Sequence, residues 1–246
     1  MTEKPNSFQR RESKFLIPSN QVEKLTQDVE FLTDKIGLEE EHYPFNYNRT
    51  VYFLPQEASF SRFSIRYRDY ASGSLDEVGV YSGSEGSLEI KCKEKSKSKV
   101  NHKLKISIPF CESLTVAELR LIIEESPLSN KKKHWFLDRL NEQGLDDSTV
   151  ISPSTAVSYQ RRRFHRGENV FNIDSDLKYF KVAIIDDKAV LIKTGEDEGV
   201  VCELKEQTDD VTMRWQVYRK LVKNKADWAK SKKSNSILAT QVENSL

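Results

Sequence analysis

The chain has 246 residues, 37% hydrophobic and 31% charged, so it is long enough to bury a core and has the composition of a soluble globular protein. Its 39 basic residues nearly balance its 38 acidic ones, and the net charge of +1 excludes a general electrostatic attraction to nucleic acid or anionic lipid. Three widely spaced cysteines argue against a disulfide scaffold, and no apolar run approaches the length of a membrane span. We therefore expect a cytoplasmic protein with no nucleic-acid partner and no membrane segment in this chain; a membrane-protein partner is left open.

The first predicted strand covers residues 10–17 and follows a loose leader, residues 1–7. Arg10, Glu12 and Lys14 share one face of this strand, while Phe15 and Ile17 lie on the other. This is the period-2 pattern of a half-buried strand. A carboxylate and an ammonium group therefore lie two residues apart on its charged face.

A helix is predicted next, with Asn20 and Glu23 at capping-box spacing and Gly37 at its C-terminal end. Strands then cover about residues 49–54 and 62–70, and a loop rich in glycine and serine is expected from 71 to 87. In the second of these strands, arginines at positions 66 and 68 alternate with apolar residues. Both arginines are therefore expected on one face of the sheet.

Two charged strands follow, over residues 88–95 and about 99–108. Strict alternation places Glu89 in phase with the odd-numbered lysines of this hairpin. These are Lys91, Lys93, Lys95, Lys97, Lys99, Lys103 and Lys105. For the two lysines at the turn, positions 95 and 97, a solvated hairpin is the preferred interpretation.

The second half begins with two helices and then returns to strands. Thr115 and Glu118 form a capping-box pattern at one helix start, and another helix is predicted over residues 131–143. Strands are predicted at 156–165, 169–174, 177–184, 188–193 and 199–206, before a last helix that begins at Asp209.

About eight antiparallel strands are enough to close a barrel, which also removes exposed sheet edges. We predict an α+β fold, an eight-stranded antiparallel β-barrel with helices inserted between strands and packed outside. The barrel is expected to form one domain over residues 8–233, with flexible termini at 1–7 and 234–246.

Charged side chains on the inward phase of the strands are the main functional signal. The basic ones are Lys14, Arg66, Arg68, Lys91, Lys103, Arg161 and Lys205, and the acidic ones are Glu12, Glu89 and Glu203. Several arginines and lysines in one enclosure can bind a polyanion, and carboxylates among them offer the hard oxygen ligands that Mg²⁺ or Mn²⁺ prefers. The alternative interpretation is a solvated sheet face with cross-strand ion pairs. The sequence has no phosphate-binding loop, dinucleotide-binding motif or nucleophile elbow, and its histidines lack metal-ligand spacing.

Six short motifs follow one another along the chain. They are Arg10–Phe15, Ile65–Arg68, Leu88–Lys91, Tyr159–Phe164, Ile173–Leu177 and Glu203–Lys205. In order and approximate spacing they resemble the VTC-type polyphosphate polymerase domain, and the resemblance runs from about residue 8 to 233. That family belongs to the triphosphate tunnel metalloenzymes, which share an eight-stranded antiparallel tunnel. Arg10 stands where other branches of the superfamily have a glutamate, as in the VTC branch.

The resemblance implies roles for individual residues. Arg66, Arg68, Lys91 and Arg161 are expected to be catalytic, and Lys14, Lys103, Lys205 and Lys232 are expected to bind phosphate groups. Glu203 is the expected ligand of Mn²⁺ or Mg²⁺, with Glu89 and Glu12 as further candidates. One position departs from the family, because Val170 stands where an arginine is usual; Arg163 and Arg166 are candidates to compensate.

The function implied by the resemblance is metal-dependent phosphoryl transfer inside a basic tunnel. Its partners would be a nucleoside triphosphate such as ATP and polyphosphate, which the transfer would extend. Hydrolysis of an inorganic or nucleoside triphosphate is an alternative, because water can replace the polyphosphate acceptor. A non-catalytic polyphosphate-binding module is another, motivated by Val170.

Overall fold

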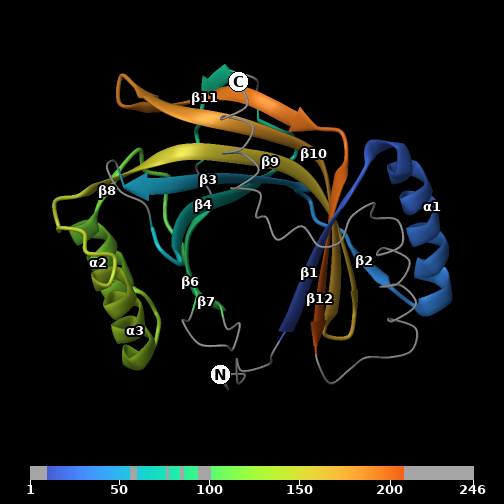
Figure 1. Cartoon of the computed structure of the whole chain (residues 1–246), viewed down its shortest axis with the longest axis horizontal. Helices are drawn as coiled ribbons and strands as arrows, with labels where there is room; N and C mark the ends of the chain where they lie inside the picture. Colours follow the sequence, from blue (N-terminus) through green and yellow to red (C-terminus); the bar gives the residue numbers. More distant parts are fainter. Residues whose placement is uncertain (1–9, 56–59, 76–77, 84–85, 94–100, 208–246) are drawn as a thin grey trace.

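The computed structural model describes residues 10–55, 60–75, 78–83, 86–93 and 101–207 (Figure 1). Its strands are β1 (Arg10–Ile17), β2 (Glu39–Glu41), β3 (Tyr47–Pro55), β4 (Phe63–Ala71), β5 (Val78–Val80), β6 (Gly86–Lys93), β7 (Asn101–Ser107), β8 (Leu114–Thr115), β9 (Val150–Arg166), β10 (Asn169–Ile185), β11 (Lys188–Asp197) and β12 (Val200–Gln207). Its helices are α1 (Ser19–Ile36), α2 (Val116–Glu125) and α3 (Asn130–Asn141). In this part of the chain no helix combines the length and apolarity needed to cross a bilayer.

All the strands belong to one antiparallel sheet, whose main path has the order β1-β12-β10-β9-β3-β4-β6-β7. The sheet bends into an arch, with β6 and β7 on one side, β1 and β12 on the other, and β9, β10 and β3 across the top (Figure 1). The α+β class and the eight-stranded antiparallel path predicted from the sequence are confirmed. Between the described parts of the two end strands, β1 and β7, no ladder is formed.

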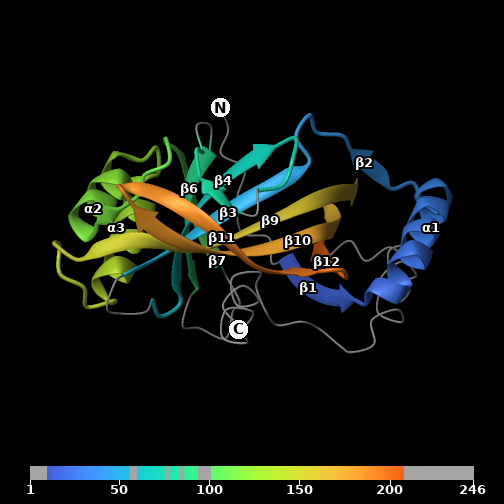
Figure 2. The ribbon, with the colours of Figure 1, turned by 90° about the horizontal axis from the view of Figure 1, so that it is seen from above.

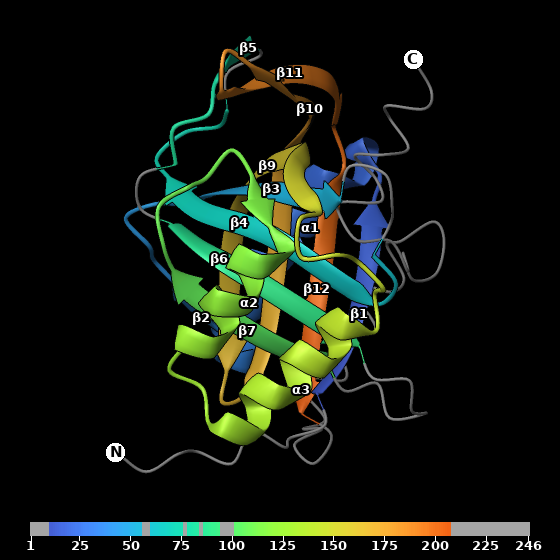
Figure 3. The same cartoon turned by 90° about the vertical axis from the view of Figure 1, so that its left-hand side faces the viewer.

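Apolar side chains cover the outer face of the arch, where the helices pack. Leu25 and Val29 of α1 pack against Phe15, Phe164 and other outward residues of β1, β9, β10 and β12. Helices α2 and α3 cover the outward residues of β3, β4 and β6 in a larger core (Figure 3). The view from above places α1 and the α2–α3 pair at opposite ends of the molecule (Figure 2). The inward face of the arch is left for the charged side chains.

The helix ends follow capping chemistry, with one correction to the sequence prediction. Thr115 and Glu118 form the predicted capping box, because the Thr115 hydroxyl accepts a bond from the Glu118 N–H and the Glu118 carboxylate accepts one from the Thr115 N–H. The capping box predicted for Asn20 is wrong, since α1 begins at Ser19 with Pro18 as its N-cap and no side-chain bond. Asn20 already lies inside the first turn, where it cannot cap. Gly37 ends the helix with φ 64°, as predicted.

Two connections differ from the sequence prediction. The expected loop over 71–87 contains β5, which pairs with β11. The expected strands 169–174 and 177–184 are one strand, β10, in which a β-bulge lies between Ser175 and Lys178 and Asp176 adopts φ 50°. The predicted helix from Asp209 and the expected phosphate ligand Lys232 lie outside the described residues, and the predicted domain limits stay predictions.

We expect Tyr67→Ala to lower the free energy of unfolding by about 3–5 kcal/mol, because it empties a packed site in the outer core. Tyr67 is fully buried, donates a hydrogen bond to the Gly83 carbonyl (3.0 Å) and contacts the rings of Tyr81 and Phe110. Urea unfolding would measure the change. The control is Tyr70→Ala on the same strand, where 45% exposure predicts a loss below about 1 kcal/mol. Equal effects would contradict the assignment of faces.

Candidate active site

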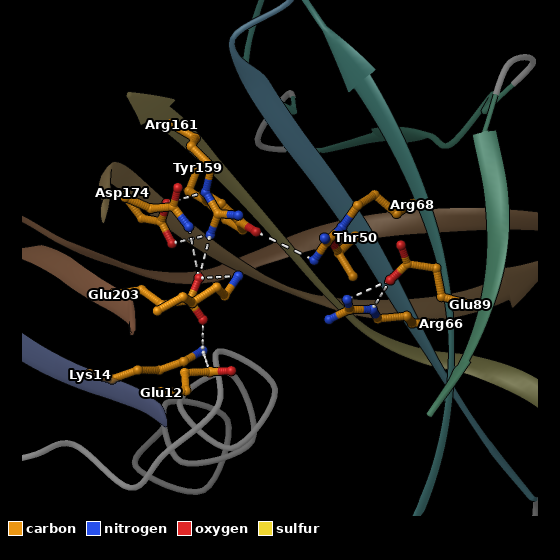
Figure 4. A network of polar contacts seen from close by, with 12 residues as sticks. Glu12, Lys14, Thr50, Arg66, Arg68, Glu89, Tyr159, Arg161, Asp174 and Glu203 are labelled. Carbon is orange, nitrogen blue, oxygen red and sulfur yellow. Dashed lines mark hydrogen bonds and ion pairs between the residues drawn. The ribbon is translucent and has the colours of Figure 1, made fainter. Parts of the chain in front are cut away.

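One side of the arch interior is rich in cations. The register of β4, β6 and β7 aligns Ser64 with Lys91 and Lys103, Arg66 with Glu89 and Lys105, and Arg68 with Ser87. Because directly opposed residues share a face, these side chains form three neighbouring rows, and Figure 4 shows Arg66, Arg68 and Glu89 together. We call this set the cationic wall: Arg66, Arg68, Lys91, Lys103 and Lys105 with the single carboxylate Glu89.

Glu89 is the anion at the centre of the cationic wall. It is 1% exposed, and its carboxylate accepts hydrogen bonds from Arg66 (Nε, 2.7 Å) and from Lys103. Burial alone would raise the pKa of Glu89, but Arg66, Arg68 and Lys103 outweigh it and lower the pKa to about 2. Glu89 is therefore ionised at neutral pH and satisfied by cations.

Lys91 and Arg68 have no carboxylate of their own among the described residues. Burial lowers the pKa of Lys91 to about 7, and the positive charges of Arg66 and Arg68 add to the shift. Arg68 bonds to two neutral groups, the Thr50 hydroxyl (3.2 Å) and the Tyr159 hydroxyl (3.4 Å). Arg68 is thus held in place by neutral groups, and neither residue has a neutralising partner among the described residues.

The opposite side of the interior carries balanced charges. Cross-strand rows here run Glu12–Lys205–Val170–His165–Glu39, Lys14–Glu203–Asn172–Arg163–Glu41 and Leu16–Val201–Asp174–Arg161. We call this set the paired wall: Lys14, Arg161 and Lys205 with Glu12, Asp174 and Glu203. Three cations face three carboxylates, in contrast to the cationic wall.

Glu203 is the centre of the paired wall. One of its oxygens lies 3.1 Å from Lys14 Nζ (Figure 4). The other lies 2.9 Å from Lys205 Nζ and accepts a hydrogen bond from Asn172 Nδ2 at 2.9 Å. Burial opposes ionisation, but Lys14, Lys205 and Arg161 hold the pKa of Glu203 well below its usual value. Burial and the neighbouring Glu203 charge raise the pKa of Glu12.

Tyr159 connects the two walls. Its hydroxyl accepts a hydrogen bond from Arg68, and its ring lies 5.2 Å from the Arg161 guanidinium carbon. Arg161 in turn makes two hydrogen bonds to Asp174, of 2.6 and 2.7 Å (Figure 4). The arginines expected to be catalytic are therefore held at fixed positions across one interior.

Between the walls, the inward face carries an apolar strip. Its buried members are Val157, Tyr159, Leu177, Tyr179 and Val201, with Leu16 and Tyr52 packed beside them. Such a surface beside buried charges lowers the local dielectric and strengthens electrostatic contacts with a bound anion.

The structure brings together most of the residues singled out in the sequence, but in two groups. Arg66, Arg68, Lys91 and Lys103 share the cationic wall with Glu89, whereas Lys14, Arg161 and Lys205 share the paired wall with Glu12 and Glu203. The three expected metal ligands are therefore not gathered, because Glu89 lies apart from the other two. Across the described residues, no group of three Asp, Glu, His or Cys side chains could hold a metal ion.

A divalent cation could still find oxygen donors on the paired wall. Glu12 and Glu203 share Lys14 as a partner, at 3.5 and 3.1 Å. Beside them, Asn172 Oδ1 is buried without a hydrogen-bond partner in the described structure, and its orientation is fixed by the bond from Nδ2 to Glu203. Two carboxylates and an amide oxygen suit Mg²⁺ or Mn²⁺, which take few protein ligands and complete their shell with water and phosphate.

Four polar residues of the site were not singled out as functional from the sequence. Asp174, Asn172, Tyr159 and Thr50 lie on the inward phase of their strands and contact the expected residues. Alternation along the predicted strand 169–174 could have identified the first two. The contacts of the others depend on pairing between strands far apart in the sequence.

Comparison with known proteins shows the fold. No family model matches the chain, and no curated protein matches its sequence. Among solved structures, it is similar to a candidate adenylyl cyclase from Hippeastrum with dominant triphosphatase activity, at 14% identity, TM-score 0.51 and 94% coverage of each chain. Candidate adenylate cyclases from Bacillus halodurans (11% identity, TM-score 0.48, 92% of this chain and 96% of that one) and Vibrio parahaemolyticus (11%, 0.43, 96% and 98%) are more distant. The Hippeastrum protein shares the antiparallel tunnel fold expected from the sequence.

We expect Glu89→Gln to destabilise the protein by about 3 kcal/mol at pH 7, because it leaves Arg66 and Lys103 without their charged partner. The folded-state pKa of about 2 lies below the unfolded value of about 4.3, so this stability is present above pH 4.5 and is lost as the pH falls toward 2. Denaturant unfolding at pH 6 and pH 3 should therefore show the wild-type advantage shrinking. Glu142→Gln, at an exposed pair with Arg139, is the matched control and should cost less than about 1 kcal/mol. A difference independent of pH would contradict the assignment.

We also expect anion binding to protonate Lys91. Its pKa of about 7 in the free protein should rise beside a bound anion, so binding between pH 7 and 8 should take up a proton. Calorimetry with tripolyphosphate, in buffers of different ionisation enthalpy, measures this uptake. Lys91→Arg keeps a permanent charge, so uptake should fall and affinity should decline less with rising pH than in the wild type. Identical profiles for the two proteins would refute the role of Lys91.

Proposed function

We propose that this protein binds triphosphate or polyphosphate in the interior of the arch and catalyses metal-dependent phosphoryl transfer. The observation that carries the proposal is the charge imbalance of the cationic wall, where five basic residues accompany one carboxylate. Burying cations without partners is unfavourable, so an anion that fills the interior would be bound strongly. The nearly neutral net charge makes this attraction local rather than global.

A linear chain of phosphates fits this distribution of charge better than a single phosphate does. Cations lie on successive rows of β4, β6 and β7, and Arg161 faces them beyond Tyr159. Arginine binds phosphate oxygens through a planar fork and lysine acts as a point charge, so several adjacent groups can each be held.

The residues of this chain would act mainly by alignment and charge neutralisation. Arg68 is held by Thr50 and Tyr159, so its guanidinium needs little reorganisation to meet charge developing on a transferred group. Lys91 and Lys103 would hold neighbouring phosphates. Glu203 and Glu12, with the Asn172 amide oxygen, would hold Mn²⁺ or Mg²⁺, which supplies positive charge beside the phosphates when bound. No protein nucleophile is required, because a phosphate oxygen or water can attack.

The group that accepts the phosphoryl group decides whether the reaction is polyphosphate synthesis or hydrolysis. Polyphosphate synthesis from ATP is the transfer implied by the resemblance to the VTC-type domain. Hydrolysis is the second candidate, favoured by the fold shared with the Hippeastrum protein described by its triphosphatase activity. Incubation with ATP and Mn²⁺, followed by separation of the products by size, distinguishes them, with EDTA as the metal control. Long chains support synthesis and free phosphate supports hydrolysis, whereas tight tripolyphosphate binding without turnover would leave a binding module.

We expect Arg68→Ala to reduce turnover by about 10²–10³-fold, because it removes a preorganised donor to the transferred group. Arg66 is already paired with Glu89, so Arg66→Ala should combine a loss of activity with a loss of stability. The rates would be measured at saturating ATP with Mn²⁺. Arg120→Ala on α2, which breaks an exposed pair with Asp147, is the control and should keep wild-type turnover. Near-normal turnover in Arg68→Ala would show that the transferred phosphoryl group does not lie beside the cationic wall.

A further inference from the structure

β9 carries three consecutive arginines, each beside a carboxylate, but they are not held equally. Arg161 makes hydrogen bonds of 2.6 and 2.7 Å to Asp174, and Arg162 makes two of 2.8 and 3.0 Å to a β2 glutamate. Arg163 has one ion contact, 3.4 Å between its Nε and Glu41 Oε2. It is therefore the least firmly held of the three.

The faces of the strand separate these arginines. Arg162 points outward, where it also approaches Glu30 of α1 at 3.6 Å. Arg163 shares the inward face with Arg161 and lies directly opposite Asn172, whose other neighbour in the row is Glu203. The guanidinium of Arg163 thus belongs to the row that contains the centre of the paired wall.

Arg163 also has unused donor capacity. Its Nε, the atom that lies 3.4 Å from Glu41, is buried and has no partner in hydrogen-bond geometry in the part of the chain that the structure describes, so the Glu41 contact is an ion contact without a hydrogen bond. The side chain as a whole is 39% exposed, compared with 19% for Arg161, so a ligand in the interior can reach the guanidinium. A planar guanidinium with free N–H groups is a strong donor to phosphate oxygens.

The adjacent row explains why this arginine matters. Val170 lies between Lys205 and His165 and is apolar, so the inward residues of β10 from Val170 to Asp174 carry no cation. A phosphate chain that extends past Arg161 toward β2 would therefore meet Arg163 as the next guanidinium along β9.

We propose that Arg163 is a further anion-binding residue of the interior, held by Glu41 in the free protein and released when a phosphate chain competes for it. The inference rests on the proposed function, since it names an additional contact for the same class of ligand. Glu41 would then weaken binding, because the anion must displace it. The neighbouring pair of Arg162 and Glu40 should have no such effect.

The test is calorimetric titration of the full chain with tripolyphosphate at two salt concentrations. Arg163→Ala should weaken binding about tenfold, the effect of one charge-assisted contact at a partly exposed site, and should lower the dependence of affinity on salt by about one ion. Arg162→Ala is the matched control and should bind as the wild type does. Glu41→Gln should tighten binding several-fold, whereas Glu40→Gln should not.

The outcomes separate the inference from the proposed function. Wild-type protein that does not bind tripolyphosphate would overturn the proposed function, and the inference with it. Wild-type binding that is unchanged by both Arg163→Ala and Glu41→Gln would overturn the inference alone. Should Arg163→Ala lower the melting temperature strongly, Glu41→Gln decides, because it keeps the arginine and removes the charge of its partner; Tyr43→Phe and His165→Gln are the controls for the other two contacts of Glu41.

Discussion

Basic residues on the inward face that outnumber nearby carboxylates are the constraint on which this structure depends. Glu89 neutralises Arg66 and Lys103, but Arg68 and Lys91 are left to neutral groups and to the repulsion of their neighbours. Such an arrangement survives only if the rest of the fold is stable enough to hold it. The outer cores against α1 and against α2 and α3 provide that stability, and they pack on the faces of the strands opposite the charges.

The two walls respond differently to an anion. The paired wall is already satisfied by its own carboxylates, so a ligand or metal there must compete with existing ion pairs such as Lys14–Glu203. Around Arg68 and Lys91, the described part of the cationic wall has no carboxylate that an anion must displace. Under the proposed function, the cationic wall would recognise the anion, and the paired wall would adjust to charge changes during transfer.

The alternation of inward and outward side chains along the strands explains how much of the site could be predicted from the sequence. Strict period-2 patterns in β1, β4 and β6 placed Lys14, Arg66, Arg68 and Glu89 on one face, because the outward positions had to be apolar for the helices to cover them. The division into two walls could not be predicted, since it depends on the order of strands in the sheet. The sequence pattern likewise placed three carboxylates on the inward face. It did not show that β6, which carries Glu89, is separated in the sheet from β1 and β12, which carry Glu12 and Glu203.

The bulge in β10 decides which half of that strand lines the interior. Before it, the inward residues are even-numbered, as at Asn172 and Asp174; after it they are odd-numbered, as at Tyr179. From Ser175 to Lys178, β10 advances by three residues while its partner β9 advances by two. The one extra residue in β10 exchanges the parity of the inward and outward side chains. If β10 ran over the same residues without the bulge, the even-numbered Phe180 would face the interior and Tyr179 would face the outer core; the extra residue therefore keeps Phe180 in the outer core. A single-residue insertion or deletion in the regular part of β10 after the bulge would reverse the phase of every later residue, so it should be tolerated far less well than a substitution there.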